Sequence, residues 1–197
     1  PTALLPWRNH GWHLTLHISP EGFRTEPIHA AAGTFELGFD LIRHRFTIDG
    51  SDGHHGGFAL EPMSVARFHE MALGLIDEAG HAVRIDGAPN EVDPAIPFKA
   101  DTEPRAYHRD SADRLRRALL SADRVMRLFR SGFLGKASPV HFFWGSFDLA
   151  VTRFSGRRAP LHPGGIPNLP DAVTREAYSH EVSSAGFWSG GANGGSP

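Results

Sequence analysis

The segment FELGFDLIRHRFTI, residues 35–48, decides the fold class. Apolar side chains alternate with polar or small ones from Phe35 to Leu41, and again at Phe46 and Ile48. Alternation with a period of two is typical of a strand that buries one face. The short polar interval between the two runs predicts the turn of an antiparallel hairpin.

The sequence on either side of this hairpin predicts further strands. Residues 12–18 also alternate, and a turn at 20–22 closes that run. A Gly- and Asp-rich turn at 51–57 precedes a short predicted strand at 58–60, and another follows at 82–85. The apolar and aromatic run from Ser138 to Val151 predicts a strand buried on at least one face.

Helical periodicity separates these strands. Residues 65–79 carry one apolar stripe, with Ser64 placed as N-cap and Gly80 just past the end. Residues 111–130 form a second predicted helix, and 171–178 a short third one. The sequence therefore predicts an α+β fold, with an antiparallel sheet and two main helices on one face. A strongly curved, barrel-like sheet is the alternative.

Composition limits the classes of protein. A chain of 197 residues with 40% hydrophobic residues fits one domain, residues 1–197. The Gly-rich end, residues 190–197, is expected to be a flexible tail. A formal net charge of −2 argues against nucleic acid as a partner, and no apolar run is long enough for a membrane. We expect a cytoplasmic protein of unspecified oligomeric state, and the start at Pro1 suggests a fragment of a longer chain.

The chain contains no cysteine, which excludes disulfides, thiolate nucleophiles and Cys-ligated metal. A metal would need ligands from the 13 histidines and the carboxylates. His13 and His17 would stand about 13 Å apart on a strand, too far to share one ion. His54 and His55 lie in an expected exposed turn. No metal site or cofactor is predicted, and a His/carboxylate metal site remains an alternative.

Two longer-range patterns leave alternatives open. Pro27-Ile28-His29 matches Pro160-Leu161-His162 at a fixed offset along the chain, so an internal duplication is conceivable. The outer face of the helix at 111–130 carries arginines, but aspartates interleave with them and predict a solvated face. Those arginines are Arg114, Arg116, Arg117, Arg124, Arg127 and Arg130.

The first candidate functional segment is the aromatic strand at 141–153. Strict alternation assigns one face to the core, namely Phe143, Phe147, Leu149 and Val151. The other face carries Trp144, Ser146, Asp148 and Thr152, a mixture suited to a ligand-facing wall. The alternative is that Asp148 faces water or pairs with Arg153 or Arg157.

The second candidate segment is 178–188. His180 and Glu181 cannot act together, because neighbouring side chains in a strand face opposite sides. His180 with Asp148 would form a carboxylate-oriented imidazole, able to act as a general base near neutral pH. A capping or buried structural histidine is the alternative. The link between the two segments places Arg157 and His162 among glycines, which predicts either an anion site or an exposed turn.

The strings HFFWGSFDLAVTRFSGR, residues 141–157, and SHEVSSAGFW, residues 179–188, resemble signature motifs of an uncharacterised bacterial domain-of-unknown-function family. The resemblance extends from about Asn9 onward. It implies membership of that fold family and no particular activity. It also implies that members carry further segments before the first strand and after the glycine tail.

These observations lead to one main functional hypothesis and two alternatives. The main hypothesis is a small-molecule-binding protein or enzyme whose site lies between strand 141–153 and segment 178–188. The alternatives are a non-enzymatic protein-interaction module and the metal-binding protein. The candidate catalytic residues are Asp148, His180, His141 and Glu181, and the candidate ligand-binding residues are Trp144, Arg153, Arg157, His162 and Trp188.

Overall fold

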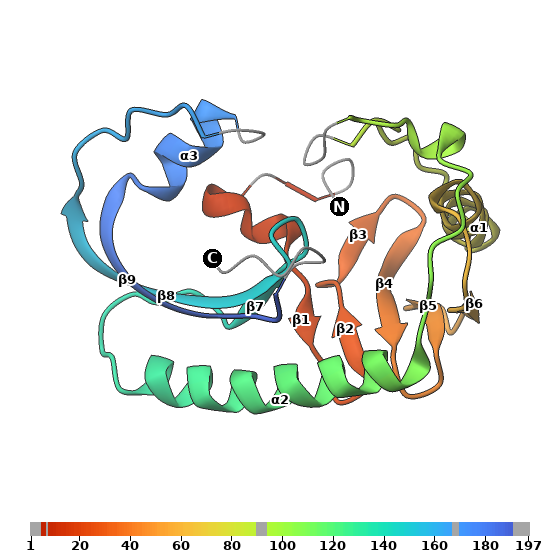
Figure 1. Cartoon of the computed structure of the whole chain (residues 1–197), viewed down its shortest axis with the longest axis horizontal. Helices are drawn as coiled ribbons and strands as arrows, with labels where there is room; N and C mark the ends of the chain where they lie inside the picture. The colour runs from red at the N-terminus through yellow and green to blue at the C-terminus, as the bar shows by residue number, and fades with distance from the viewer. Residues whose placement is uncertain (1–4, 7, 90–93, 167–169, 191–197) are drawn as a thin grey trace.

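The computed structural model describes residues 5–6, 8–89, 94–166 and 170–190. Within these ranges the chain forms two antiparallel sheets, one of six strands and one of three, together with three α-helices (Figure 1). The predicted α+β class is confirmed. The strands divide between two open sheets, and neither closes into a barrel.

The larger sheet contains the predicted hairpin. Strands β4 and β5 pair with Phe39 opposite Phe46 and Leu37 opposite Ile48, as the alternation requires. The sheet has the order β1-β2-β4-β5-β6, and β3 also pairs with β4. Its strands are β1 (His17–Ile18), β2 (Gly22–Arg24), β3 (Ile28–Ala30), β4 (Gly33–Asp40), β5 (Arg45–Gly50) and β6 (His55–Ala59).

Helix α1 (Val65–Glu78) covers the apolar face of this sheet. The ring of Phe68 lies 6.2 Å from that of Phe39 and 5.3 Å from that of Phe46, measured between centroids. The predicted helix ends are confirmed, since Ser64 Oγ accepts a hydrogen bond from the Arg67 amide and Gly80 follows at φ +80°. A left-handed residue just past a helix is the usual place for glycine.

The smaller sheet consists of β7 (His141–Phe143), β8 (Asp148–Arg158) and β9 (His180–Trp188), with β8 in the middle. Its β8–β9 ribbon is strongly curved (Figure 1). Helix α2 (Arg109–Ser131) lies on the convex side, where it contacts β8 and β9. On the concave side lie helix α3 (Asp171–Ala177) and the 3-10 helix η1 (Asn9–Leu14).

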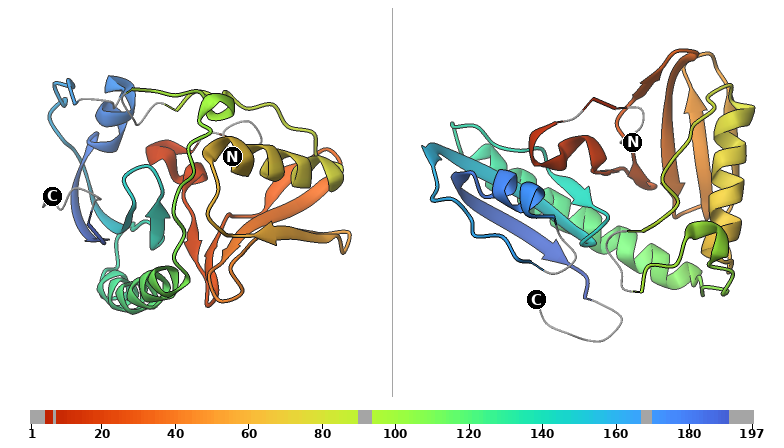
Figure 2. Two further views of the ribbon diagram at one scale, coloured as in Figure 1. Left: turned by 45° about the vertical axis from the view of Figure 1, so that its right-hand side comes forward. Right: turned by 90° about the horizontal axis from the view of Figure 1, so that it is seen from above.

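A backbone bridge joins the two sheets. The Leu16 amide donates to the Phe142 carbonyl at 2.9 Å, and the Phe142 amide donates to the Leu16 carbonyl at 2.7 Å. Helix α2 also contacts β1 of the larger sheet, so it passes beneath both (Figures 1 and 2). A short 3-10 helix, η2 (Phe98–Ala100), contacts α1.

The prediction of one strand through 138–151 is wrong. Residues 144–147 form a turn between β7 and β8, and Phe147 has a left-handed φ of +60°. The apolar run is continuous in sequence, so it does not reveal the reversal. Because Phe143 pairs with Asp148, it lies on the face opposite Leu149 and Val151. Those two residues are buried toward α2, as predicted for a core face.

Three other local predictions also fail. Residues 12–18 form the end of η1 and only a short strand, because His10 and Gly11 take left-handed φ values and bend the chain. Residues 82–85 pair with no strand in the described part of the chain. Ser19 to Gly22 make a turn, whereas the matching residues at 152–155 run on within β8, so the two proposed repeats differ in conformation.

Several arginines of α2 form ion pairs along the helix, as expected for a solvated face. Asp113 pairs with Arg116 and Arg117, and Asp123 pairs with Arg127. None of the helices in the described ranges is long and apolar enough to cross a membrane. The predicted glycine tail lies outside the described residues from 191 onward.

Leu149 tests whether β8 forms the core of the smaller sheet. Its side chain is 0% exposed, so Leu149→Ala removes buried methyl groups and leaves a cavity. We expect urea denaturation to show a loss of about 2–5 kcal/mol in the free energy of unfolding. The matched control is Leu161→Ala, at a side chain that is 79% exposed, which should change stability by less than about 0.5 kcal/mol. Equal effects of the two substitutions would contradict this packing.

Candidate functional site

Asp148 and His180, the two residues most expected to act together, lie far apart. Asp148 pairs with Trp188 at one end of the β8–β9 ribbon, and His180 pairs with Arg158 at the other. The 11-residue strand β8 runs between these ends. A strand of this length covers roughly 30 Å. The hypothesis of an Asp148–His180 pair is therefore wrong, because the β8–β9 pairing places the two residues at opposite ends.

Asp148 belongs to the turn end of the smaller sheet. It accepts a hydrogen bond from Ser146 Oγ, and neither Arg153 nor Arg157 forms a described ion pair with it. Trp144 is 45% exposed, and its indole Nε1–H donates to the Leu14 carbonyl at 2.8 Å. Asp148, Trp144 and Trp188 thus lie around the β7–β8 turn, away from His180.

The two predicted anion-binding arginines have other partners. The guanidinium carbon of Arg153 lies 3.5 Å from the ring centroid of Phe129 on α2, a cation–π contact. Arg157 Nε donates to Glu181 Oε2 at 2.6 Å, and the Arg157 and Glu181 side chains are solvent-exposed. Arg153 therefore attaches β8 to α2. Arg157 and Glu181 neutralise each other at the edge of the sheet.

His162 has local contacts only. Its ring stacks on that of Tyr178 at 5.0 Å between centroids, and its Nδ1 accepts a hydrogen bond from the Gly164 amide at 3.0 Å. These contacts attach the 159–166 crossing to the end of α3. His162 thus helps to hold this irregular segment against α3.

His141 is buried beneath η1 with 2% of its surface exposed. Thr15 Oγ1 donates its only proton to the Trp12 carbonyl at 3.0 Å, so at 3.1 Å it accepts from His141 Nδ1. Burial, together with the smaller effect of the nearby His17, lowers the pKa of His141 from 6.5 to about 4. His141 is therefore neutral near pH 7 and supports η1 from below.

His180 lines a large pocket on the concave side of the smaller sheet. Its volume is about 860 Å³, within the range of small-molecule sites. The walls come from η1 and the residue before it, the end of β8, the start of β9, and the segment that follows α2. The described lining residues are Arg8, His10, Trp12, Gly135, Lys136, Ala137, Phe154, Ser155, Gly156 and His180. We name this the cationic pocket.

The charged side chains that line the cationic pocket are all of one sign. Its described lining residues include Arg8 and Lys136 but no aspartate or glutamate. Arg8 also pairs with Glu26 outside the pocket, whereas Lys136 takes part in none of the described ion pairs. The Phe154 amide donates to the Lys136 carbonyl at 2.9 Å, which fixes the backbone of Lys136 beside β8.

Aromatic rings also line the cationic pocket. The ring of Phe154 lies 5.4 Å from that of His10 and 6.1 Å from that of Trp12, and the last two are 5.8 Å apart. Such rings offer a flat ligand large contact areas at little cost in side-chain entropy. The pocket therefore combines a cationic side with an aromatic side.

His10 is held in an unusual backbone conformation at this wall. It has φ +63°, and its amide donates to Glu176 Oε1 on α3 at 3.2 Å. Left-handed backbone outside glycine is found preferentially at functional sites. Burial lowers the pKa of His10, the charge of Glu176 opposes this, and His180 lowers it further. His10 is therefore mainly neutral at pH 7, and Arg8 and Lys136 supply the fixed charge.

Sequence analysis found His180 but missed the rest of this pocket. Residues 8–12 meet residues 135–137 and 154–156, more than a hundred positions along the chain, and no short-range pattern links these segments. The one local signal is Gly11, since a glycine inside an alternating run can mark a bend.

Comparison with known proteins identifies the family. A model of the family of unknown function DUF5996 matches residues 1–197. The chain belongs to this family. The predicted membership of a domain-of-unknown-function family is thus confirmed, and the family carries no assigned activity. Neither the curated proteins nor the solved structures contain a match.

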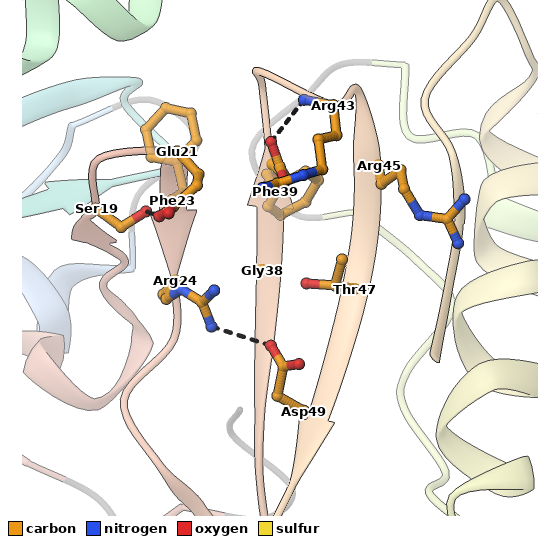
Figure 3. A pocket seen from close by; sticks show the side chains of 11 residues that line it. Ser19, Glu21, Phe23, Arg24, Gly38, Phe39, Arg43, Arg45, Thr47 and Asp49 are labelled. Carbon is orange, nitrogen blue, oxygen red and sulfur yellow. Dashed lines mark hydrogen bonds and ion pairs between the residues drawn. The ribbon is translucent and has the colours of Figure 1, made fainter. Parts of the chain in front are cut away.

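A second polar depression lies on the outward face of the larger sheet (Figure 3). Its volume is about 270 Å³. Arg24 donates to Asp49 at 3.0 Å, and Arg43 pairs with Asp40 at 2.8 Å. Because its cations and carboxylates are paired with each other, this depression carries no excess charge of one sign.

The histidines do not assemble into a metal centre in the described ranges. No group of three or more His, Asp or Glu residues there has the arrangement needed to hold an ion. His55 pairs with Asp49 at 2.9 Å on the edge strand β6. The alternative of a metal-binding protein therefore gains no support from the geometry.

His141 makes the stability of the fold depend on pH. The unfolded chain takes up a proton near pH 6.5 and the folded chain only near pH 4, so unfolding is favoured as pH falls through this window. We expect the free energy of unfolding to decrease by about 3 kcal/mol from this residue. Urea denaturation at several pH values measures the slope of the free energy of unfolding against pH.

In His141→Gln no group titrates at this position, so we expect a flatter slope between pH 6.5 and 4. His29→Gln, at an exposed position on β3, is the control and should keep the wild-type slope. If both variants kept that slope, the buried imidazole would not be its source.

Proposed function

We propose that the protein binds a small aromatic anion in the cationic pocket. The observation that carries this proposal is the lining itself, since it joins Lys136 and Arg8 to a cluster of rings and the described part contains no carboxylate. Among the described lining residues the formal charges are those of Arg8 and Lys136, while Glu26 and Glu176 contact Arg8 and His10 from outside the lining. The volume of about 860 Å³ accommodates a ring system with a carboxylate or phosphate group.

The arrangement of the walls favours a planar ligand over inorganic anions. The rings of Phe154 and Trp12 are tilted by 57° to each other, so a flat ligand can stack on one of them while its charged group reaches Lys136. Ser155 and Gly156 add a hydroxyl and an uncovered backbone at the same edge. Small polar groups of this kind orient a ligand inside a largely apolar pocket.

The test compares two probes that differ only in charge, 1-naphthoate and 1-naphthamide. We expect isothermal titration to show tighter binding of 1-naphthoate, because only its carboxylate carries a negative charge that Lys136 attracts. In Lys136→Ala we expect the affinity for 1-naphthoate to fall about tenfold, with little change for 1-naphthamide. Increasing salt should weaken the naphthoate complex selectively.

The matched control is Lys99→Ala, on η2 and not among the residues that line the pocket, which should bind both probes as the wild type does. Phe154→Ala should weaken both probes equally, since it removes a ring face and no charge. Equal affinity of the wild type for 1-naphthoate and 1-naphthamide would overturn the proposal.

A further inference from the structure

A second pocket, lined almost wholly by apolar side chains, lies between the larger sheet and α1. The buried side chains of Ile28, Phe35 and Phe46 form its floor, and Phe68 and Ala72 of α1 form one wall. The segment after α1 and the indole of Trp144 complete the rim. The described lining residues also include Leu14, Leu16, Thr25, Leu37, Phe39, Val65, His69, Leu73, Ile76, Val83, Ile85 and Phe98. We name this the apolar pocket.

The size of the apolar pocket sets it apart from ordinary core packing. Its volume is about 440 Å³. Protein interiors are packed as densely as organic crystals and contain few voids larger than a water molecule. An apolar space of this size also offers water no hydrogen-bond partners, so water fills it unfavourably. A ligand that buried these side chains would remove apolar surface from water, and this would stabilise the complex.

The same size decides between a small molecule and a docked helix. One turn of helix is about 5.4 Å long and about 10 Å across, and so takes up roughly 420 Å³. The pocket would hold about a single turn, whereas helix docking needs anchors spaced over at least two. Its described walls come from the larger sheet, α1, the β7–β8 turn, and the side chains of Val83, Ile85 and Phe98.

The apolar pocket has few polar side-chain atoms, and those of Thr25 and Trp144 are already engaged. Thr25 Oγ1 accepts from the Leu37 amide at 3.0 Å, and the Trp144 indole donates to Leu14. No Asp, Glu, Lys or Arg is among the described lining residues, and His69 is the one titratable group there. A charged ligand would lose its hydration without gaining a partner of opposite charge.

We propose that the apolar pocket is a second binding site, which takes a small uncharged hydrophobic molecule such as an alkyl chain. A neighbouring pocket of about 450 Å³, on the α2 side of the same sheet face, shares Leu16, Phe39 and Trp144 with it. The two pockets therefore border each other at these residues. This proposal does not depend on the function of the cationic pocket.

The experiment uses the uncharged fluorescent probe N-phenyl-1-naphthylamine with the full chain. We expect saturable binding of one probe per chain, displaced by 1-decanol and at least tenfold less well by decanoate. Saturating 1-naphthoate should not displace the probe, because its carboxylate would lose its hydration in the apolar pocket without gaining a charged partner. Displacement by decanoate as effective as by 1-decanol would overturn the assignment to an uncharged ligand.

Ala72→Phe fills the pocket from α1 and should lower the affinity for the probe at least tenfold. Ala172→Phe, the same substitution at an exposed position of α3, is its matched control. Should Ala72→Phe fail to fold, Trp144→Ala is the second variant. It removes an exposed rim side chain and should also lower the affinity for the probe about tenfold. Unchanged binding in the folded pocket variants, or one probe per two chains, would overturn the proposal.

Discussion

A pair of backbone hydrogen bonds between Leu16 and Phe142 joins the two sheets of the molecule. These bonds join the first strand of one sheet to the first strand of the other, and helix α2 crosses beneath the join. The two segments that lie between the sheets, η1 and the β7–β8 turn, are both next to this bridge in the chain. Just before Leu16, the chain forms η1 over the concave side of the smaller sheet. Just after Phe142, the β7–β8 turn brings Trp144 to the apolar face of the larger one.

The environment of this bridge explains why a buried histidine is tolerated. His141, next to Phe142, donates to Thr15, next to Leu16, and Thr15 in turn donates to the Trp12 carbonyl. A buried polar group without a partner costs free energy, whereas this chain satisfies each donor in sequence. Trp12 also meets the His141 ring edge-on at 5.8 Å. The hydrogen bonds from His141 to Thr15 and from Thr15 to Trp12 therefore support η1 from below. They also fix the orientation of the pocket wall that η1 forms.

The sequence predicts those structural features that depend on residues close together in the chain. The β4–β5 hairpin follows from alternation, and the ends of α1 follow from Ser64 and Gly80, because each of these signals acts within a few positions. The β7–β8 reversal was missed because it places Phe147, an apolar residue, at a left-handed position where turn residues are expected. The same limit applies to the candidate site. His180 was identified as a candidate general base, but the pocket that it lines also takes residues from the 8–12 segment, more than a hundred positions earlier in the chain.

The failed prediction of a strand at 12–18 also explains how the two pockets become separate. In a continuous strand Trp12, Leu14 and Leu16 would share one face, since side chains repeat every two residues. The left-handed residues His10 and Gly11 and the 3-10 turn break this period. Trp12 then faces the cationic pocket, while Leu14 and Leu16 face the apolar one. A left-handed histidine costs roughly 1 kcal/mol, and its backbone hydrogen bond to Glu176 offsets that cost. The bend thus places Trp12 and Leu14 against different pockets, although residues two positions apart share one face in a regular strand.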